Sequence, residues 1–230
     1  MPQYKILLMD ADETLLDFRR SEGVALEHTL KDYGVTMTTE IHELYHAING
    51  VLWKQLETGD ITRAHLKTER FKRLFEAIGL SSADPAVFNE RYMTMLGSTG
   101  FLLEGAEELL SELSGRFAVY LITNGTASVQ HTRLENSGIL PYLSGVYISE
   151  EVGADKPSEV FFERVLEALG NPDKRECLVI GDSLSSDIDG GNRVGIDTCW
   201  YNPSGLLPPA HIVPTVQVAS YGELRRFLFA

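Results

Sequence analysis

The sequence of 230 residues is poor in cysteine and in basic residues, and it contains no long apolar run. Its two cysteines, Cys177 and Cys199, are too few for a disulfide scaffold, and no cluster of cysteine and histidine offers a zinc site. We expect both to be small buried residues. The apolar run before Asp10 is too short for the core of a signal peptide or for a membrane span. We therefore expect a cytoplasmic protein in a reducing compartment.

Basic residues are outnumbered by acidic ones, 20 to 33, which gives a net charge of −13 and a pI near 4.9. This balance argues against binding to nucleic acid or to an acidic membrane, both of which need a basic surface. The same charge would repel a phosphorylated substrate, so any attraction must come from local groups. Hydrophobic residues make up 43% of the chain and charged residues 23%, as in an ordinary globular protein.

Two carboxylates follow directly after the first apolar segment. Residues 6–8, Ile-Leu-Leu, predict a short buried strand, and Asp10 and Asp12 come just after it. In open α/β sheets the carboxyl ends of the strands face the ligand crevice. Two acids this close raise each other's pKa unless a cation shares the site. A divalent metal with oxygen ligands, above all Mg²⁺, is therefore expected here, although a helix-capping turn is an alternative for this segment taken alone.

A second apolar strand, residues 119–122, ends in Thr123, Asn124 and Gly125. A hydroxyl, an amide and a glycine at a strand end can donate hydrogen bonds to a phosphate. We therefore expect Thr123 and Asn124 to bind phosphate.

Two further junctions carry charged residues. Lys156 precedes Pro157, which we expect at the first position of a helix over residues 158–169, where an anion is favoured. A third strand, residues 178–180, leads to Asp182 and then Asp187. Four signals thus follow successive predicted elements along the chain: a pair of acids, a hydroxyl with an amide, a lysine, and a second pair of acids.

With these motifs the chain resembles the phosphatase branch of the haloacid dehalogenase superfamily, from residue 4 to about residue 202. The family pattern has Gly where this chain has Glu13. Glu13, Leu15 and Phe18, with residues 181–184, resemble the bacterial pyrimidine 5′-nucleotidase subgroup. The superfamily motifs match Asp10, Asp12, Thr123, Lys156, Asp182 and Asp187.

The order of elements predicts an α/β fold. From about residue 104 helices alternate with strands, which indicates right-handed βαβ units and a parallel sheet. The resemblance implies a Rossmann-like core flanked by helices, residues 1–18 and 99–230, with an inserted four-helix cap, residues 19–98. Within the cap one helix is expected to bury an apolar stripe made of Ile41, Leu44, Tyr45, Ile48 and Leu52. The other expected helices are 104–114, 126–137, 187–194 and 221–229, and the other expected strands are 117–122, 145–149, 177–181, 197–201 and 215–218.

One motif points to different chemistry. His42 and His46 form an H-E-x-x-H pattern on a predicted helix, as in zinc proteases, and Glu69 or Glu76 offers a third ligand. The two histidines flank the apolar stripe, so we interpret them as edge residues of the cap.

The resemblance implies metal-assisted hydrolysis of a phosphate monoester. Asp10 is expected to attack phosphorus and form an aspartyl phosphate, and Asp12 to act as general acid and base. Mg²⁺ is expected on Asp10, the carbonyl of Asp12, Asp182 and Asp187, and Thr123, Asn124 and Lys156 on the phosphate.

Three alternatives stay open to different degrees. A dehalogenase needs no second acid, so Asp12 argues against it. A phosphosugar mutase shares the core residues and differs in how the cap shields the intermediate. A non-catalytic binding module on this fold would tend to lose motif acids.

The expected substrate is a small phosphorylated metabolite, with nucleoside 5′-monophosphates such as dUMP and dTMP favoured, then phosphoglycolate-type substrates.

Overall fold

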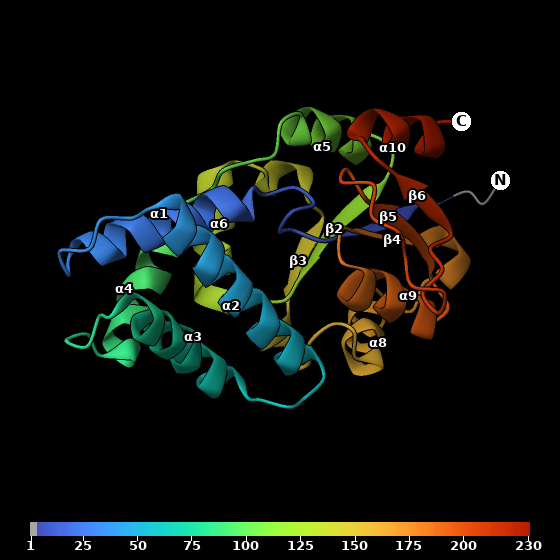
Figure 1. The fold of residues 1–230 in the computed structure, drawn as a ribbon. Coiled ribbons are helices and arrows are strands. Elements are labelled where there is room, and N and C mark those ends of the chain that lie inside the picture. The colour runs from blue at the N-terminus through green and yellow to red at the C-terminus, as the bar shows by residue number, and fades with distance from the viewer. Residues whose placement is uncertain (1–3) are drawn as a thin grey trace.

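A computed structural model describes residues 4–230. Six parallel strands form one sheet in the order β3-β2-β1-β4-β5-β6, with helices on both faces (Figure 1). The predicted α/β fold with a parallel sheet is therefore confirmed. The strands are β1 (Ile6–Met9), β2 (Ala118–Thr123), β3 (Gly145–Ile148), β4 (Cys177–Gly181), β5 (Asp197–Tyr201) and β6 (Val216–Val218).

The central strands are apolar along their length because both faces of the sheet are covered. Leu7 packs in a cluster with α5, α6 and α10, while Leu8 packs in a second cluster with α8. Figure 1 shows α5 and α10 on one side of the strands and α8 and α9 on the other. These helices are α5 (Ala106–Ser114), α6 (Ala127–Ser137), α8 (Glu159–Ala168), α9 (Asp189–Arg193) and α10 (Tyr221–Leu228).

Four helices follow β1 before the chain returns to the sheet, and they lie together beside it (Figure 1). We call them the helical block; they are α1 (Phe18–Lys31), α2 (Thr39–Glu57), α3 (Arg63–Ile78) and α4 (Pro85–Gly97). The block has a hydrophobic cluster of its own, in which the ring of Phe71 contacts those of Tyr45, Phe88 and Tyr92. The predicted helices are confirmed, while the division into a cap domain and a core domain stays a prediction.

Two local expectations were wrong. Leu44 is 36% exposed, because the buried face of α2 runs through Tyr45, Asn49 and Leu52. Pro157 is not in the helix that follows, since Ser158 N donates to Asp155 O in a turn and α8 begins two residues after the proline.

Short elements complete the fold, and some were not expected. The segment predicted as a helix over 187–194 begins earlier, with a π-helical turn ahead of α9. The short elements are α7 (Ser149–Val152), the π-helical turn Leu184–Ile188 and the 3-10 turns Leu140–Tyr142 and Lys174–Glu176.

The remaining composition-based expectations concern cysteines and membranes. Cys177 and Cys199 are buried free thiols, as expected. Across residues 4–230, each helix is too short or too polar to cross a lipid bilayer.

Candidate active site

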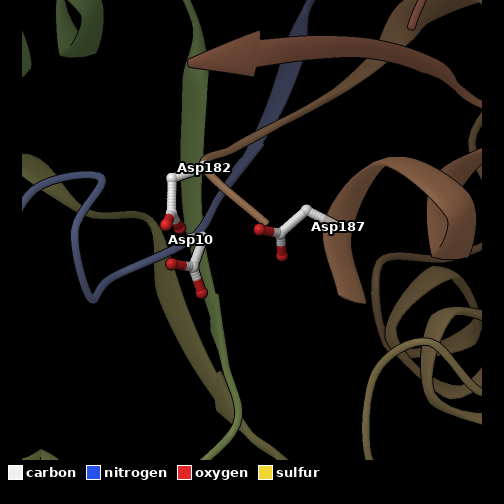
Figure 2. A group of neighbouring side chains, drawn as sticks. All are labelled: Asp10, Asp182 and Asp187. Carbon is white, nitrogen blue, oxygen red and sulfur yellow. The ribbon is translucent and has the colours of Figure 1, made fainter. Parts of the chain in front are cut away.

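The sheet brings three of the predicted residues to one edge. Asp10 follows β1, Thr123 ends β2, and Asp182 follows β4. Since β1 pairs with both β2 and β4, their carboxyl ends meet. Asp187 joins them from the π-helical turn. In Figure 2 the side chains of Asp10, Asp182 and Asp187 point toward one another, and each offers an oxygen within 4.8 Å of the others.

Lys156 lies buried against this group of acids. Its Nζ donates to Asp10 Oδ1 at 2.6 Å, to Asp187 Oδ1 at 2.7 Å and to the carbonyl of Ile122 at 2.9 Å. Burial by itself lowers the pKa of Lys156, but the two carboxylates outweigh it and hold this pKa above its ordinary value. The ammonium group is therefore charged and uses all three of its protons.

The site holds more negative charge than Lys156 can neutralise. Burial raises the pKa of Asp10 to about 7 even though Lys156 opposes the shift. Burial and the neighbouring carboxylates also raise the pKa of Asp182. Three carboxylates face one ammonium, and the oxygens of the carboxylates are the ligands that a hard divalent cation prefers. Asp187 is already bonded at both oxygens, because Oδ2 accepts from Ser183 N at 3.0 Å.

Asp12 is held by two residues of α6 that the sequence analysis missed. Arg133 Nη1 lies 2.7 Å from Asp12 Oδ1, and Gln130 Nε2 donates to Asp12 Oδ2 at 3.1 Å. Gln130 also donates to Thr123 Oγ1 at 2.8 Å. The available signal was their spacing: Gln130 and Arg133 are three apart on the helix that follows Thr123, so they share one face.

The side-chain amide of Asn124 forms two hydrogen bonds with the backbone of Lys156. Its Nδ2 donates to the carbonyl of Lys156, and its Oδ1 accepts from Lys156 N, each at 2.9 Å. The side chain therefore fixes the backbone of Lys156, and its Nδ2 keeps a second proton that it can donate to a ligand. Thr123 keeps its hydroxyl proton available, since Gln130 uses only the oxygen as acceptor.

Glu13, where the family pattern has Gly, adopts a left-handed backbone with φ of 58°. This conformation favours glycine and strains other residues. Its Oε1 accepts from Arg19 N at 2.8 Å, so the side chain caps the start of α1. Burial raises the pKa of Glu13 above its ordinary value. The neighbouring Thr14 accepts from Asp182 N at 3.0 Å and thereby connects the two acid motifs.

Two adjoining cavities open at this edge of the sheet. The first, about 230 Å³, is lined by Asp10, Thr123, Lys156 and Asp182, and we call it the acid cavity. The second, about 50 Å³, lies between the helical block and α6, and we call it the block cavity. Both are lined by Asp12, Phe18, Trp53 and Asn124.

Polar contacts join the helical block to the loops of the site. Arg63 of α3 forms an ion pair with Asp155 and donates to Ser149 Oγ at 2.5 Å. Ser185, in the π-helical turn, donates to Glu57 Oε2 of α2 at 2.9 Å. Each contact ends beside a charged residue of the site, since Asp155 precedes Lys156 and Ser185 lies between Asp182 and Asp187.

The H-E-x-x-H pattern has a partner within the helical block. His46 Nδ1 lies 2.7 Å from Glu22 Oε2, and His42 Nε2 lies 3.7 Å from it. Glu22 is fully buried, and Glu69 instead pairs with Arg73. Among residues 4–230, the group of three or more ligand-type side chains that converges is Asp10, Asp182 and Asp187, without either histidine.

Known proteins match nearly the whole chain. Pyrimidine 5′-nucleotidase PynA of Streptococcus pneumoniae is 41% identical over 222 residues, 96% of this chain and 93% of that protein. Pyrimidine 5′-nucleotidase YjjG of Escherichia coli is 37% identical over 222 residues, 96% of each protein. The crystal structure of the HAD-hydrolase YfnB from Bacillus subtilis, bound to magnesium, is similar with a TM-score of 0.94 and 35% identity, covering 99% of this chain and 100% of that one.

The family model of the haloacid dehalogenase-like hydrolases matches residues 4–195. This range includes both pairs of acids, the Thr123 motif and Lys156. The resemblance to the pyrimidine 5′-nucleotidase subgroup is confirmed by PynA and YjjG. The chain therefore belongs to the haloacid dehalogenase-like hydrolases.

Proposed function

We propose that this enzyme is a Mg²⁺-dependent phosphatase that hydrolyses the phosphate monoester of a small metabolite, with nucleoside 5′-monophosphates as the preferred class. The observation that carries the proposal is the convergence of Asp10, Asp182, Asp187 and Lys156, of which all but the half-buried Asp182 are buried, because the group combines a nucleophile, metal ligands and a cation. Three members of the group, Asp10, Lys156 and Asp182, line the acid cavity, where a ligand would reach them.

In the proposed reaction an oxygen of Asp10 attacks phosphorus, and the phosphorus–oxygen bond to the leaving group breaks. Asp10 then carries an aspartyl phosphate. Asp12 gives its proton to the departing alkoxide and later takes one from the water that cleaves the acyl phosphate. Arg133 and Gln130 hold the Asp12 carboxyl for both steps.

Asp10, the backbone carbonyl of Asp12 and Asp182 would hold the metal, with Asp187 bound directly or through water. A bound Mg²⁺ neutralises charge on the transferring phosphoryl group. Lys156 and the hydroxyl of Thr123 contribute hydrogen bonds and charge to the same group. Asn124 fixes the backbone of Lys156, and its second amide proton can donate to the phosphate, as predicted from the sequence.

The substrate class rests on the relatives and on the cavities. PynA and YjjG are pyrimidine 5′-nucleotidases. With phosphorus at Asp10 and the leaving oxygen at Asp12, the rest of the leaving group would extend into the block cavity. A nucleoside needs more room than about 50 Å³, so we propose that the helical block opens for entry and closes to exclude water. The two free buried cysteines suit a reducing cytoplasm.

A panel of phosphorylated metabolites tests the proposal. Phosphate release with Mg²⁺ is measured for dUMP, dTMP, AMP, phosphoglycolate and β-glucose 1-phosphate. We expect the highest kcat/KM for dUMP and dTMP. If phosphoglycolate or glucose 1-phosphate exceeds the nucleotides by about tenfold, a clear difference in transition-state binding, the nucleotidase assignment is wrong. Conversion of glucose 1-phosphate to another sugar phosphate without phosphate release would indicate a mutase.

A further inference from the structure

Arg133 of α6 is buried and yet has unused hydrogen-bond donors. Its side chain is 1% exposed, and its Nη1 donates to Gln130 Oε1 at 2.8 Å while lying in ionic contact with Asp12. Its Nε and Nη2 atoms are buried and have no partner. Buried donors without a partner are uncommon and costly, so these two atoms call for an explanation.

The position of Arg133 suggests what these donors serve. Arg133 lines the block cavity, and Asp12 borders both this cavity and the acid cavity. If phosphorus lies at Asp10 and the leaving oxygen at Asp12, the guanidinium group is beside the part of the substrate that departs.

Donors dominate the polar lining of the block cavity. Arg70 is also buried, and its Nε has no partner. Two side-chain acceptors already have partners, Gln130 Oε1 with Arg133 and Asn124 Oδ1 with Lys156 N, while Asp12 Oδ1 is buried without a hydrogen bond among the residues that the structure describes. Asp12, the lining carboxylate, is paired with Arg133. With several cationic donors in its lining, the cavity suits a leaving group that carries oxygen acceptors better than one that carries only donors.

We propose that Arg133 recognises the leaving group by donating from Nε or Nη2 to one of its oxygen acceptors, a sugar oxygen or a base carbonyl. Through Nη1 the same residue positions Asp12. Arg133 thus links the identity of the leaving group to the placement of the general acid. This inference rests on the proposed phosphatase function and adds to it a residue that determines specificity.

Two esters with similar primary alkoxide leaving groups separate the two roles of Arg133. dUMP carries oxygen acceptors on its leaving group, whereas n-butyl phosphate carries none, and both require protonation of an alkoxide. Arg133→Lys keeps a cation beside Asp12 and removes the extra donors, and Arg133→Met removes both. We expect Arg133→Lys to lower kcat/KM for both esters because Asp12 is held less well, and to lower it for dUMP about 10- to 100-fold more than for n-butyl phosphate, the range of a hydrogen bond from a charged donor.

Equal losses for the two esters would overturn the inference, because a residue that only holds Asp12 must affect both alike. Gln130→Ala is the matched control: it loosens Asp12 from the same helix, and we expect it to lower both activities by the same factor. Melting temperature and circular dichroism establish that each variant folds, and Arg133→Lys suffices if Arg133→Met does not.

Failure of the phosphatase function would look different, since the parent protein would then release phosphate from neither ester. In that case the affinity for dUMP, measured by calorimetry, still tests the inference. The two proteins compared both carry Asp10→Asn, and one of them also carries Arg133→Lys. Weaker binding by the lysine variant supports it, whereas equal affinity, or no binding by either protein, overturns it.

Discussion

The buried polar groups at the sheet edge differ in charge balance from those of the helical block. At the sheet edge three carboxylates face the single ammonium of Lys156, so charge remains unbalanced. In the helical block the buried Glu22 contacts His46 and Asn49, and the buried Arg70 donates to Asn49 and Asn89. The first group has an excess of negative charge and needs an external cation, whereas the charged groups of the second have partners within the block, although Arg70 Nε and the hydroxyls of Tyr45 and Tyr92 make no hydrogen bond within residues 4–230.

This difference separates chemistry from architecture. Buried polar groups that satisfy one another stabilise a unique packing, whereas groups left unbalanced in a cavity are candidates for function. The sheet edge therefore supplies the reacting groups, and the helical block supplies walls and closure. The H-E-x-x-H motif falls on the architectural side, because its histidines contact Glu22.

The largest effect is expected from Asp10→Asn. The amide cannot attack phosphorus, so kcat should fall by about 10⁴ or more, while the melting temperature stays close to that of the parent. Phosphate release from dUMP and a thermal melt measure both. Asp173→Asn, the same change at a residue paired with Arg175 on the surface, should leave kcat unchanged. Substantial turnover by Asp10→Asn would place the nucleophile elsewhere.

Removal of the metal should have the next largest effect. EDTA should lower the rate about a thousandfold, the loss expected when charge on the phosphoryl group is no longer neutralised. Mg²⁺ or Mn²⁺ should restore it, and Ca²⁺ should inhibit, because its looser coordination misplaces the reacting oxygens. Rescue by Zn²⁺ alone would point to His42 and His46 and reverse the comparison between the two regions.

A smaller effect is expected where the regions meet. Asp155→Asn removes the charge that pairs with Arg63 and so weakens closure of the helical block. Since a partly buried charged contact contributes about 1.4 kcal/mol, kcat/KM should fall about tenfold. Asp32→Asn is the matched control, because it breaks an exposed pair with Arg91 inside the block. Equal losses in the two variants would contradict a role in closure.

The smallest effect is a pH-dependent gain in melting temperature. Burial raises the pKa of Asp10 from 3.8 to about 7, so between these values the folded protein binds a proton that the unfolded chain does not. Stability of the metal-free protein should therefore fall as pH rises through this range, and Mg²⁺ should bind better once the proton has left. Melts with Mg²⁺ or EDTA should differ by a few degrees near about pH 8 and by less near about pH 5.5. A gap independent of pH would remove Asp10 from the metal site.

Much of the sheet and its edge was predictable from the sequence. Apolar runs in the sequence mark where the strands end. In a parallel sheet the carboxyl ends of neighbouring strands lie side by side, so the backbone alone brings Asp10, Thr123 and Asp182 together. A lysine after a loop is harder to place, but Lys156 belongs to the same ordered set of motifs.

The helical residues were harder to predict because helix faces depend on packing. The apolar pattern placed Leu44 on the buried face of α2, whereas the structure buries the polar Asn49 there. Arg133 shows the same limit: an arginine on a helix is usually solvated, and its burial beside Asp12 follows from contacts between residues more than 100 positions apart in the chain. Long side chains of this kind are fixed by tertiary structure rather than by local pattern.

Lys156 has a consequence for how the enzyme matures. Its ammonium donates to Asp10, Asp187 and the carbonyl of Ile122, so part of the negative charge is neutralised by the chain itself before any metal binds. Folding and metal loading are then separate events, in contrast to small zinc domains, which stay unfolded until the ion arrives. The metal-free protein should therefore be folded, so that removing the ion stops turnover without unfolding the chain.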